Sequence, residues 1–301
     1  MPDSADASVF FIGNATMIIR CHGFTLLTDP NFLHRGQRAH LGWGLGTRRR
    51  TDPAIDIDEL PPIDLVVLSH MHGDHWDDVA RDGLDKDLPI VTTHHAARRL
   101  RRQGFHRAVG LDTWQEHRVH RGDRQLKITA TPARHAPGPA RRLLPPVMGS
   151  VLDFSGDVSG DLGGDLGGDG RGRSGGPDGG GRTDLRLHIS GDTIMHPCLS
   201  EIPRRFPDID VGIVHLGGTR VLGMLVTMDG VQGAEWLRLI KPFTALTVHY
   251  DDYEAFTSSL TDLQRNVRRL GLSHLVHYLM RGETYSLPLR RPGLGHLPRA
   301  F

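Results

Sequence analysis

Short apolar runs rich in β-branched residues recur along the chain and predict β-strands. In the first part of the chain they lie at residues 9–12, 17–21, 25–28 and 65–68. They return at residues 126–130, 147–154, 185–189, 211–215 and 245–250. Apolar residues at helical spacing predict helices at residues 76–84, 95–103, 231–240 and 256–270. This mixture of strands and helices in both halves is typical of an α/β fold.

Two segments lack such a pattern. Residues 31–61 carry Gly, Arg and Pro without a clear period, which predicts a long surface loop of the kind that is often functional. Residues 155–183 are mostly Gly and Asp, so they have almost nothing to bury and a high entropy cost of ordering. We interpret them as a disordered loop insertion. A calcium-binding Gly-Asp repeat is rejected because the period breaks at Arg171-Gly-Arg173.

Composition narrows the classes of protein. The 301 residues and 38% hydrophobic content suit one large domain or two small ones with a substantial core. A net charge of +1 gives no argument for a nucleic-acid partner, and no apolar run approaches the roughly 20 residues that span a membrane. The start of the chain, Met1–Ser8, does not resemble a signal peptide, and Cys21 and Cys198 form no disulfide framework. We expect a cytoplasmic protein with a small-molecule substrate and no membrane insertion, and a homo-oligomer stays open.

The most informative motif is Ser69-His-Met-His-Gly-Asp-His-Trp-Asp77, which directly follows an apolar run. It places His70, His72, Asp74 and His75 close together, and imidazole nitrogens and carboxylate oxygens are the ligands that Zn²⁺ and similar metals prefer. Alternation in an extended segment would point His70 and His72 the same way, and Gly73 would permit a tight turn. One metal could take the first pair of ligands and a second metal the next pair.

Three further candidate ligands each follow a predicted strand. His135 lies in Pro132-Ala-Arg-His135, Asp192 in Ser190-Gly-Asp-Thr193, and His249 at the end of the run 245–250. A sheet presents site residues on the loops at its strand ends, so these side chains are candidates to complete the metal site.

The motif and its remote partners resemble the metallo-β-lactamase superfamily of hydrolases. The opening Val9–Ile19, the Pro-Ala-Arg-His and Ser-Gly-Asp-Thr forms, and the segment Val226–Leu237 are similar to the branch of ascorbate-phosphate lactonase and N-acyl-phosphatidylethanolamine phospholipase D. The resemblance implies a four-layer αββα sandwich formed by a single metallo-hydrolase domain over residues 1–301. It also implies two divalent metal ions, zinc first with manganese or iron as alternatives, and a bridging Asp192. The implied ligands are His70, His72 and His135 for metal 1, and Asp74, His75 and His249 for metal 2.

The motifs also indicate supporting residues. Asp29, Asp77 and Thr193 are candidates to orient the metal ligands, although each could equally be a turn or cap residue. A second group follows strands on the side of the predicted site and could contact substrate: His215, Arg220 and Tyr250. One departure from the branch is Asn14, which stands where a Gly-His-Ala-Thr sequence is common. Because Asn14 matches no ligand position, the departure concerns substrate contacts rather than the metals.

The expected reaction is hydrolysis of an ester, lactone or phosphodiester bond by a metal-bridged hydroxide. Asp74 would both bind metal and orient the nucleophile, and His249 would belong to the same catalytic group. A phospholipase D-like phosphodiesterase is the first alternative, but it would need an apolar groove that the sequence does not plainly show. A di-iron redox protein is a second alternative, although such relatives use an acidic residue where this chain has His72. A metal-stabilised binding module is a third.

Overall fold

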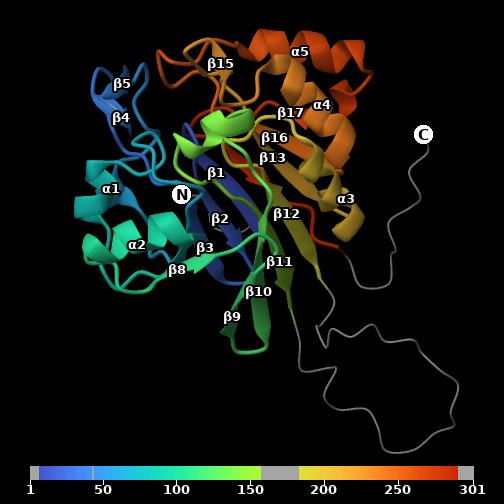
Figure 1. Ribbon diagram of the computed structural model, residues 1–301. Helices are drawn as coiled ribbons and strands as arrows, with labels where there is room; N and C mark the ends of the chain where they lie inside the picture. Colours follow the sequence, from blue (N-terminus) through green and yellow to red (C-terminus); the bar gives the residue numbers. More distant parts are fainter. Residues whose placement is uncertain (1–6, 43, 157–182, 291–301) are drawn as a thin grey trace, which may run out of the picture.

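The computed structural model describes residues 7–42, 44–156 and 183–290, and in this part of the chain two seven-stranded sheets pack face to face (Figure 1). The first sheet has the order β18-β1-β2-β3-β6-β7-β8. Its strands are β1 (Ala7–Gly13), β2 (Thr16–Cys21), β3 (Phe24–Thr28), β6 (Leu65–Val67), β7 (Ile90–Thr93), β8 (Ala108–Leu111) and β18 (Thr284–Ser286). The second has the order β17-β16-β13-β12-β11-β10-β9. Its strands are β9 (Glu116–Arg121), β10 (Arg124–Thr131), β11 (Gly149–Ser155), β12 (Leu185–Ile189), β13 (Val211–His215), β16 (Thr244–Val248) and β17 (Val276–His277).

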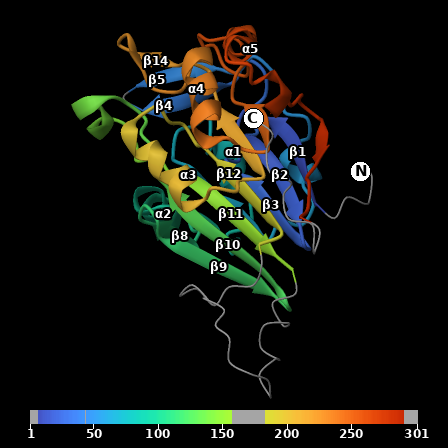
Figure 2. The same ribbon diagram turned by 90° about the vertical axis from the view of Figure 1, so that its right-hand side faces the viewer.

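Helices cover the outer face of each sheet (Figures 1 and 2). The helices α1 (Asp78–Gly83) and α2 (His94–Arg102) pack on the first sheet, where Ala80 and Leu100 meet Val66 in one apolar cluster. The second sheet is covered by α3 (Glu201–Arg205), α4 (Gly230–Ile240) and α5 (Leu260–Arg269). The order of layers is therefore helix, sheet, sheet, helix, which confirms the αββα sandwich that the motifs implied.

The main core lies between the two sheets and follows from alternation along the strands. In β1, Val9 and Phe11 face the second sheet, whereas Ile12 packs under the helices on the other side. In β13, Ile213 faces inward and Val214 packs against the outer helices. Because both faces of these strands are covered, they are apolar almost throughout, which is why the sequence reveals them as continuous runs.

The expected surface loop at residues 31–61 contains a hairpin of β4 (Arg38–Gly42) and β5 (Leu45–Arg48), together with the short 3₁₀ helix η1 (Ile57–Glu59). Only Ala39 and Thr47 are buried in this hairpin, so its polar alternation gave no strand signal. The remaining short elements are β14 (Arg220–Val221), β15 (Met224–Leu225), η2 (Gly138–Arg142), η4 (Pro197–Ser200) and η5 (Ser273–Leu275).

Two predicted helices begin later than expected because a side chain caps each of them. In α5 the Ser259 hydroxyl accepts from the Asp262 amide, and the Asp262 carboxylate accepts from the Ser259 amide, so the helix begins at Leu260 rather than at residue 256. In α1 the Asp77 carboxylate accepts from the Ala80 amide, so the helix begins at Asp78.

The candidate ligands all follow the carboxyl ends of strands at one edge of the sandwich. In the second sheet β12, β13 and β16 are parallel neighbours, and in the first sheet β3, β6 and β7 are parallel neighbours. Parallel strands end at the same edge, so the loops that follow β6, β12 and β16 lie together, as does the loop after β10, which runs in the same direction as β12. This edge positions the site.

The predicted insertion 155–183 lies outside the described residues except for Ser155, Gly156 and Thr183. The strands on either side of it are paired, with Phe154 of β11 opposite Leu185 of β12. Among the described residues, we find no helix with the length and apolar character needed to cross a bilayer.

Candidate metal centre

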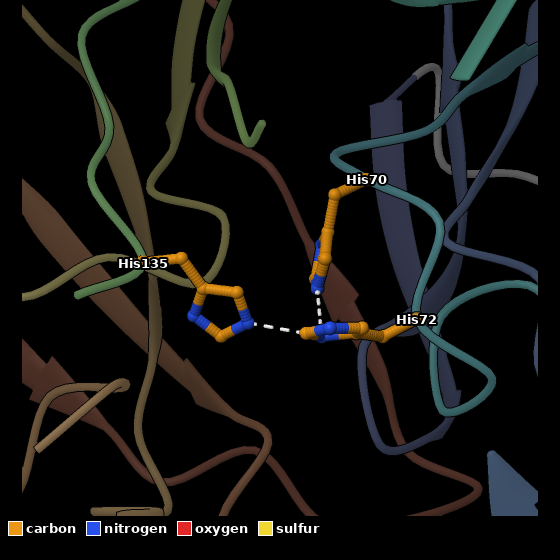
Figure 3. A group of neighbouring side chains, drawn as sticks. All are labelled: His70, His72 and His135. Carbon is orange, nitrogen blue, oxygen red and sulfur yellow. Dashed lines mark hydrogen bonds between the residues drawn. The ribbon is translucent and has the colours of Figure 1, made fainter. Parts of the chain in front are cut away.

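Three histidine side chains from opposite sheets converge on one point (Figure 3). His70 and His72 lie on the loop after β6, and His135 lies on the loop after β10. The Nδ1 atom of His72 is 3.0 Å from Nε2 of His70 and 3.0 Å from Nε2 of His135. All three side chains are buried.

A second group lies beside the first and contains Asp74, His75, Asp192 and His249. The Nε2 atoms of His75 and His249 are 3.1 Å apart, and Nε2 of His249 is 3.4 Å from Oδ2 of Asp74. All four residues are buried. This group also joins the two sheets, because Asp74 and His75 follow β6 whereas Asp192 and His249 follow β12 and β16.

The Asp192 carboxylate lies between the two groups. Its Oδ2 atom is 3.3 Å from Nε2 of His75 in the second group, and 3.9 Å and 4.0 Å from Nε2 of His70 and His135 in the first. Its Oδ1 atom is 3.6 Å from Nε2 of His249. A carboxylate in this position could bind a cation in each group at once.

The outer nitrogens of four of these rings are held by hydrogen-bond acceptors. The Nδ1 atom of His135 is 2.7 Å from the carbonyl of Val226, and Nδ1 of His249 is 3.2 Å from the carbonyl of Leu216. The Nδ1 atom of His75 is 3.1 Å from the Asp29 carboxylate. For His70 the partner is the Ser69 hydroxyl at 2.9 Å, which donates its own proton to Asp29.

Because these partners accept hydrogen bonds, each outer nitrogen carries the proton and each inner nitrogen of a neutral ring carries a lone pair. Nδ1 of His72 carries at most one hydrogen, so it cannot donate fully to both the His70 and His135 nitrogens that lie 3.0 Å from it, whereas a cation among the three rings would be bound by all of them. Oδ1 of Asp74 and Oδ1 of Asp192 are also buried without a hydrogen-bond partner. The donor set of imidazole nitrogens and carboxylate oxygens therefore fits divalent metal ions.

The pKa values of the histidines differ between the two groups. Burial lowers the pKa of His72 to about 3, and it also lowers the pKa values of His70 and His135, so the first group is neutral. Burial opposes charge on His75 too, but the carboxylates of Asp192, Asp74 and Asp29 outweigh it and raise the pKa of His75 well above its usual value. The second group therefore holds a proton that a metal ion would displace.

Asp29 lies at the centre of a hydrogen-bond network that supports the candidate metal ligands. Its carboxylate accepts from the amide and the hydroxyl of Ser69, at 2.6 Å and 2.9 Å, and faces His75 on one side and His215 on the other. Burial favours its neutral form, but His75 and His215 outweigh that effect and lower the pKa of Asp29 to about 2. His215 is fully buried behind His75, with parallel rings 6.1 Å apart, and does not line the cavity above the two groups.

Asp77 and Thr193 form hydrogen bonds with the backbones of loops around the site. Asp77 caps α1 and accepts from the amides of Phe32 and Leu33, which ties the 31–33 segment to the motif. The Thr193 hydroxyl accepts from the amide of Arg134 beside His135. The Tyr250 hydroxyl donates to the carbonyl of Leu279 and so points away from the site.

Gly73 has a different role from the one its motif position indicated. It does not adopt a positive φ, but a Cβ atom there would lie 2.6 Å from the backbone nitrogen of His40. Its amide donates to the His40 carbonyl at 2.9 Å. Glycine is therefore needed so that the β4–β5 hairpin can lie directly against the motif.

Sequence reasoning missed the role of Asn14. The Nδ2 atom of Asn14 donates to the carbonyl of Asp74 at 2.6 Å, and the Asn14 carbonyl accepts from the amide of His249 at 2.8 Å. Its own amide donates to Asp252, which also lies near the fully buried Arg49. Its φ is 53°, a conformation that Asn tolerates better than most residues, so the residue type is the one signal of this role that the sequence contains.

A cavity of about 580 Å³ opens above both groups. Four candidate ligands contribute to its lining: His72, Asp74, His135 and Asp192. Arg220, which was predicted to lie near substrate, is also part of the lining. A bound molecule could therefore reach the point at which the two groups meet.

Comparisons with known proteins agree with this geometry. A family model described as a Beta-lactamase superfamily domain matches residues 25–164. A metal-dependent hydrolase of Deinococcus radiodurans is 25% identical over 225 residues, which are 74% of this chain and 79% of that protein. The N-acyl-phosphatidylethanolamine-hydrolyzing phospholipase D of Saccharomyces cerevisiae is 30% identical over 124 residues, which are 39% of this chain and 25% of that protein.

An uncharacterised protein of Mycobacterium tuberculosis is 30% identical over 141 residues, or 45% of this chain, and the match spans only 36% of that relative. Among solved structures, the isothiocyanate hydrolase from Delia radicum gut bacteria superposes with a TM-score of 0.73 at 20% identity, covering 93% of this chain and 99% of that one. That likeness shows a shared fold. In its motifs, its sandwich, its convergent candidate ligands and these partial matches, the chain therefore resembles the metallo-β-lactamase superfamily of metal-dependent hydrolases.

Proposed function

We propose that the protein hydrolyses an ester, lactone or phosphodiester bond of a small substrate with the help of two divalent metal ions. The observation that carries this proposal is the pair of side-chain groups whose inner nitrogens face one another, while the outer nitrogens of four of the five rings are held by hydrogen-bond partners. When bound, the metal ions would supply Lewis acidity and a hydroxide nucleophile at neutral pH. Zinc suits this nitrogen and oxygen donor set, and manganese or iron are alternatives.

In this proposal each group holds one metal ion. His70, His72 and His135 would hold the first ion, and Asp74, His75 and His249 the second, with Asp192 bound to both. The hydrogen bonds to Val226, Leu216, Asp29 and Ser69 fix the tautomers, so that the binding nitrogens are available without rearrangement.

Asp74 is proposed to have a second role. It lines the cavity, and its Oδ1 atom has no hydrogen-bond partner. Burial opposes charge on Asp74, but His75 and His249 outweigh it and lower the pKa of the carboxyl group. Asp74 would therefore be ionised at neutral pH and could orient the attacking nucleophile through a hydrogen bond. His249, 3.4 Å from its Oδ2 atom, would hold the carboxylate in place.

A phospholipase D-like phosphodiesterase is the second candidate. The sequence did not plainly show the apolar groove that such an activity needs, but the cavity above the candidate ligands has walls rich in Leu and Val. The similarity to the yeast phospholipase D also supports this candidate. The di-iron redox alternative is less well supported, because the first group consists of three imidazoles, with His72 where such relatives have an acidic residue.

The test is a screen of metal-loaded protein against simple esters, lactones and phosphodiesters. The proposal predicts turnover of at least one class, loss of turnover after chelation, and recovery when metal is restored. His72→Ala should abolish turnover and lower metal content, whereas His94→Ala, at an exposed histidine on α2, should change neither. Absence of turnover in all three classes by fully loaded protein would contradict the proposal.

A further inference from the structure

The walls of the cavity come from three loops that are far apart in the sequence. Leu41 and Leu45 belong to the β4–β5 hairpin, Leu143 and Leu144 follow η2, and Leu222 lies in the β14–β15 hairpin. Both hairpins lie at the same end of the sandwich in Figures 1 and 2. Each loop thus brings leucine to the mouth of a cavity whose floor holds candidate metal ligands.

Three of these leucines are exposed to solvent. The exposed fractions are 50% for Leu45, 58% for Leu143 and 93% for Leu222. A single exposed leucine needs no explanation, but three around one opening form an apolar rim of the kind that marks a binding site.

The conformation of Leu222 is a second, independent observation. Its φ is 49°, at the turn between β14 and β15, directly before Gly223. A bulky apolar residue rarely adopts this backbone region, and such strain is concentrated at functional sites. The turn therefore accepts an unfavourable backbone at the position that projects a leucine at the mouth of the cavity.

Charge is scarce in the walls. Apart from the candidate metal ligands, Arg220 is the one charged side chain among the described residues that line the cavity. Its guanidinium group lies 3.8 Å from the Asp229 carboxylate and donates to the carbonyl of Gly223. Because Asp229 offsets this charge, the walls offer little to an anionic group placed away from the metals.

We propose that the substrate carries an apolar chain or ring next to the bond that is hydrolysed, and that this group lies between the three leucine-bearing loops. The inference rests on the proposed function, because it assigns a substrate class to the same site. The shared chemistry is a hydrocarbon group of several carbons, either on a soluble ester or lactone or on a lipid phosphodiester. The cavity volume of about 580 Å³ lies within the range of roughly 300–1,000 Å³ in which proteins enclose small ligands.

The first experiment measures kcat/KM of the metal-loaded protein for 4-nitrophenyl acetate, butanoate, octanoate and decanoate. Burial of each added methylene should raise kcat/KM by about two- to fourfold until the cavity is filled. A second series compares methyl and octyl 4-nitrophenyl phosphate, and phosphatidylcholine vesicles form the third arm. A preference for 4-nitrophenyl octanoate would indicate a soluble ester as the natural substrate, and a preference for vesicles would indicate a lipid. Either result supports an apolar substrate. Equal rates for all chain lengths in every series would overturn the proposal.

Rim variants make the test specific. Three variants replace exposed side chains, so their folding should not be affected: Leu222→Gln, Leu143→Gln and Leu45→Gln. Each variant should reduce the ratio of 4-nitrophenyl decanoate turnover to 4-nitrophenyl acetate turnover by about three- to tenfold. The matched control is Met280→Gln, since Met280 is 61% exposed and does not line the cavity. It should leave the ratio unchanged. An unchanged ratio in all three rim variants would contradict the assignment of the rim.

A binding measurement separates this inference from the proposed function. Calorimetry should show that octanoate and decanoate bind the metal-loaded protein more tightly than butanoate, with a negative heat-capacity change from buried apolar area. If binding strengthens with chain length but no ester or phosphodiester is cleaved, the proposed hydrolysis fails while the apolar site stands. If esters are cleaved but alkanoate binding is independent of chain length, hydrolysis stands and the apolar site fails.

Discussion

The side-chain amide of Asn14 donates a hydrogen bond to the main-chain carbonyl of Asp74 over 2.6 Å, and so joins the β1–β2 turn to the candidate metal centre. The Asn14 carbonyl also receives the amide of His249. Asn14 therefore holds the backbones of two candidate ligands that come from opposite sheets. We regard it as a positioning residue for the second group.

Asn14→Gly tests this role without adding strain, because glycine accepts the φ of 53° while the side-chain amide is lost. We expect turnover and affinity for the second metal ion to fall by about 10–100-fold, the usual effect of losing a partner that orients a ligand. Titration calorimetry of the apoprotein would measure the affinities. Unchanged affinity at both sites would show that Asn14 serves only the turn.

Asp29 should act through His75. Asp29→Asn removes the charge that fixes the outer nitrogen of His75, and we expect a loss of about 10–100-fold in activity or metal affinity. Since His75 and His215, acting against burial, lower the pKa of Asp29 to about 2, its carboxylate is ionised at all working pH values. The loss should therefore be the same at pH values on either side of neutrality. Asp58→Asn, at an exposed position on η1, is the matched control.

Asp192 is the proposed bridge. Asp192→Asn keeps the shape of the side chain but removes the charge that offsets repulsion between the metal ions. Hydrolysis should drop by roughly a hundredfold or more. The second metal ion should be lost first, because the first keeps three histidines. Two retained metal ions with near-normal turnover would assign the bridge to another acidic residue.

Replacement of residues 157–182 by a short Gly-Asn turn should leave folding and metal content intact. Phe154 and Leu185 are paired at the ends of β11 and β12, and the Gly156 amide donates to the Asp184 carboxylate, so the strands can be joined directly. Loop-closure cost changes only slowly with loop length. A large decrease in melting temperature relative to the full chain would show that this segment contributes to stability.

The resemblance carried by the motifs predicted the sandwich, and apolar runs predicted many of its strands, because buried strands in such a fold are continuous apolar runs. The short strands β7 and β8 were not predicted. The sequence also predicted neither the β4–β5 hairpin nor β9, because strands such as Glu116–Arg121 are mostly polar and partly exposed. The spacing of His70, His72, Asp74 and His75 indicated metal chemistry by itself, since ligands so close together along the chain need no tertiary information.

Other parts of the site could not be predicted. The partners of His135 and His249 are the carbonyls of Val226 and Leu216, and a backbone atom leaves no trace in residue identity. His215 was expected near substrate because it follows a strand, but alternation along β13 buries its ring behind His75. The leucine rim depends on three loops that only the fold brings together.

We expect the two groups together to bind two metal ions. Elemental analysis of the apoprotein after reconstitution with zinc, and separately with manganese or iron, measures this directly. We expect saturation close to two ions per chain, and close to one when His72→Ala removes a ligand of the first group. Saturation at one ion in the unaltered protein would exclude a bridge between two ions at Asp192, and saturation at zero would show that neither group binds a metal ion.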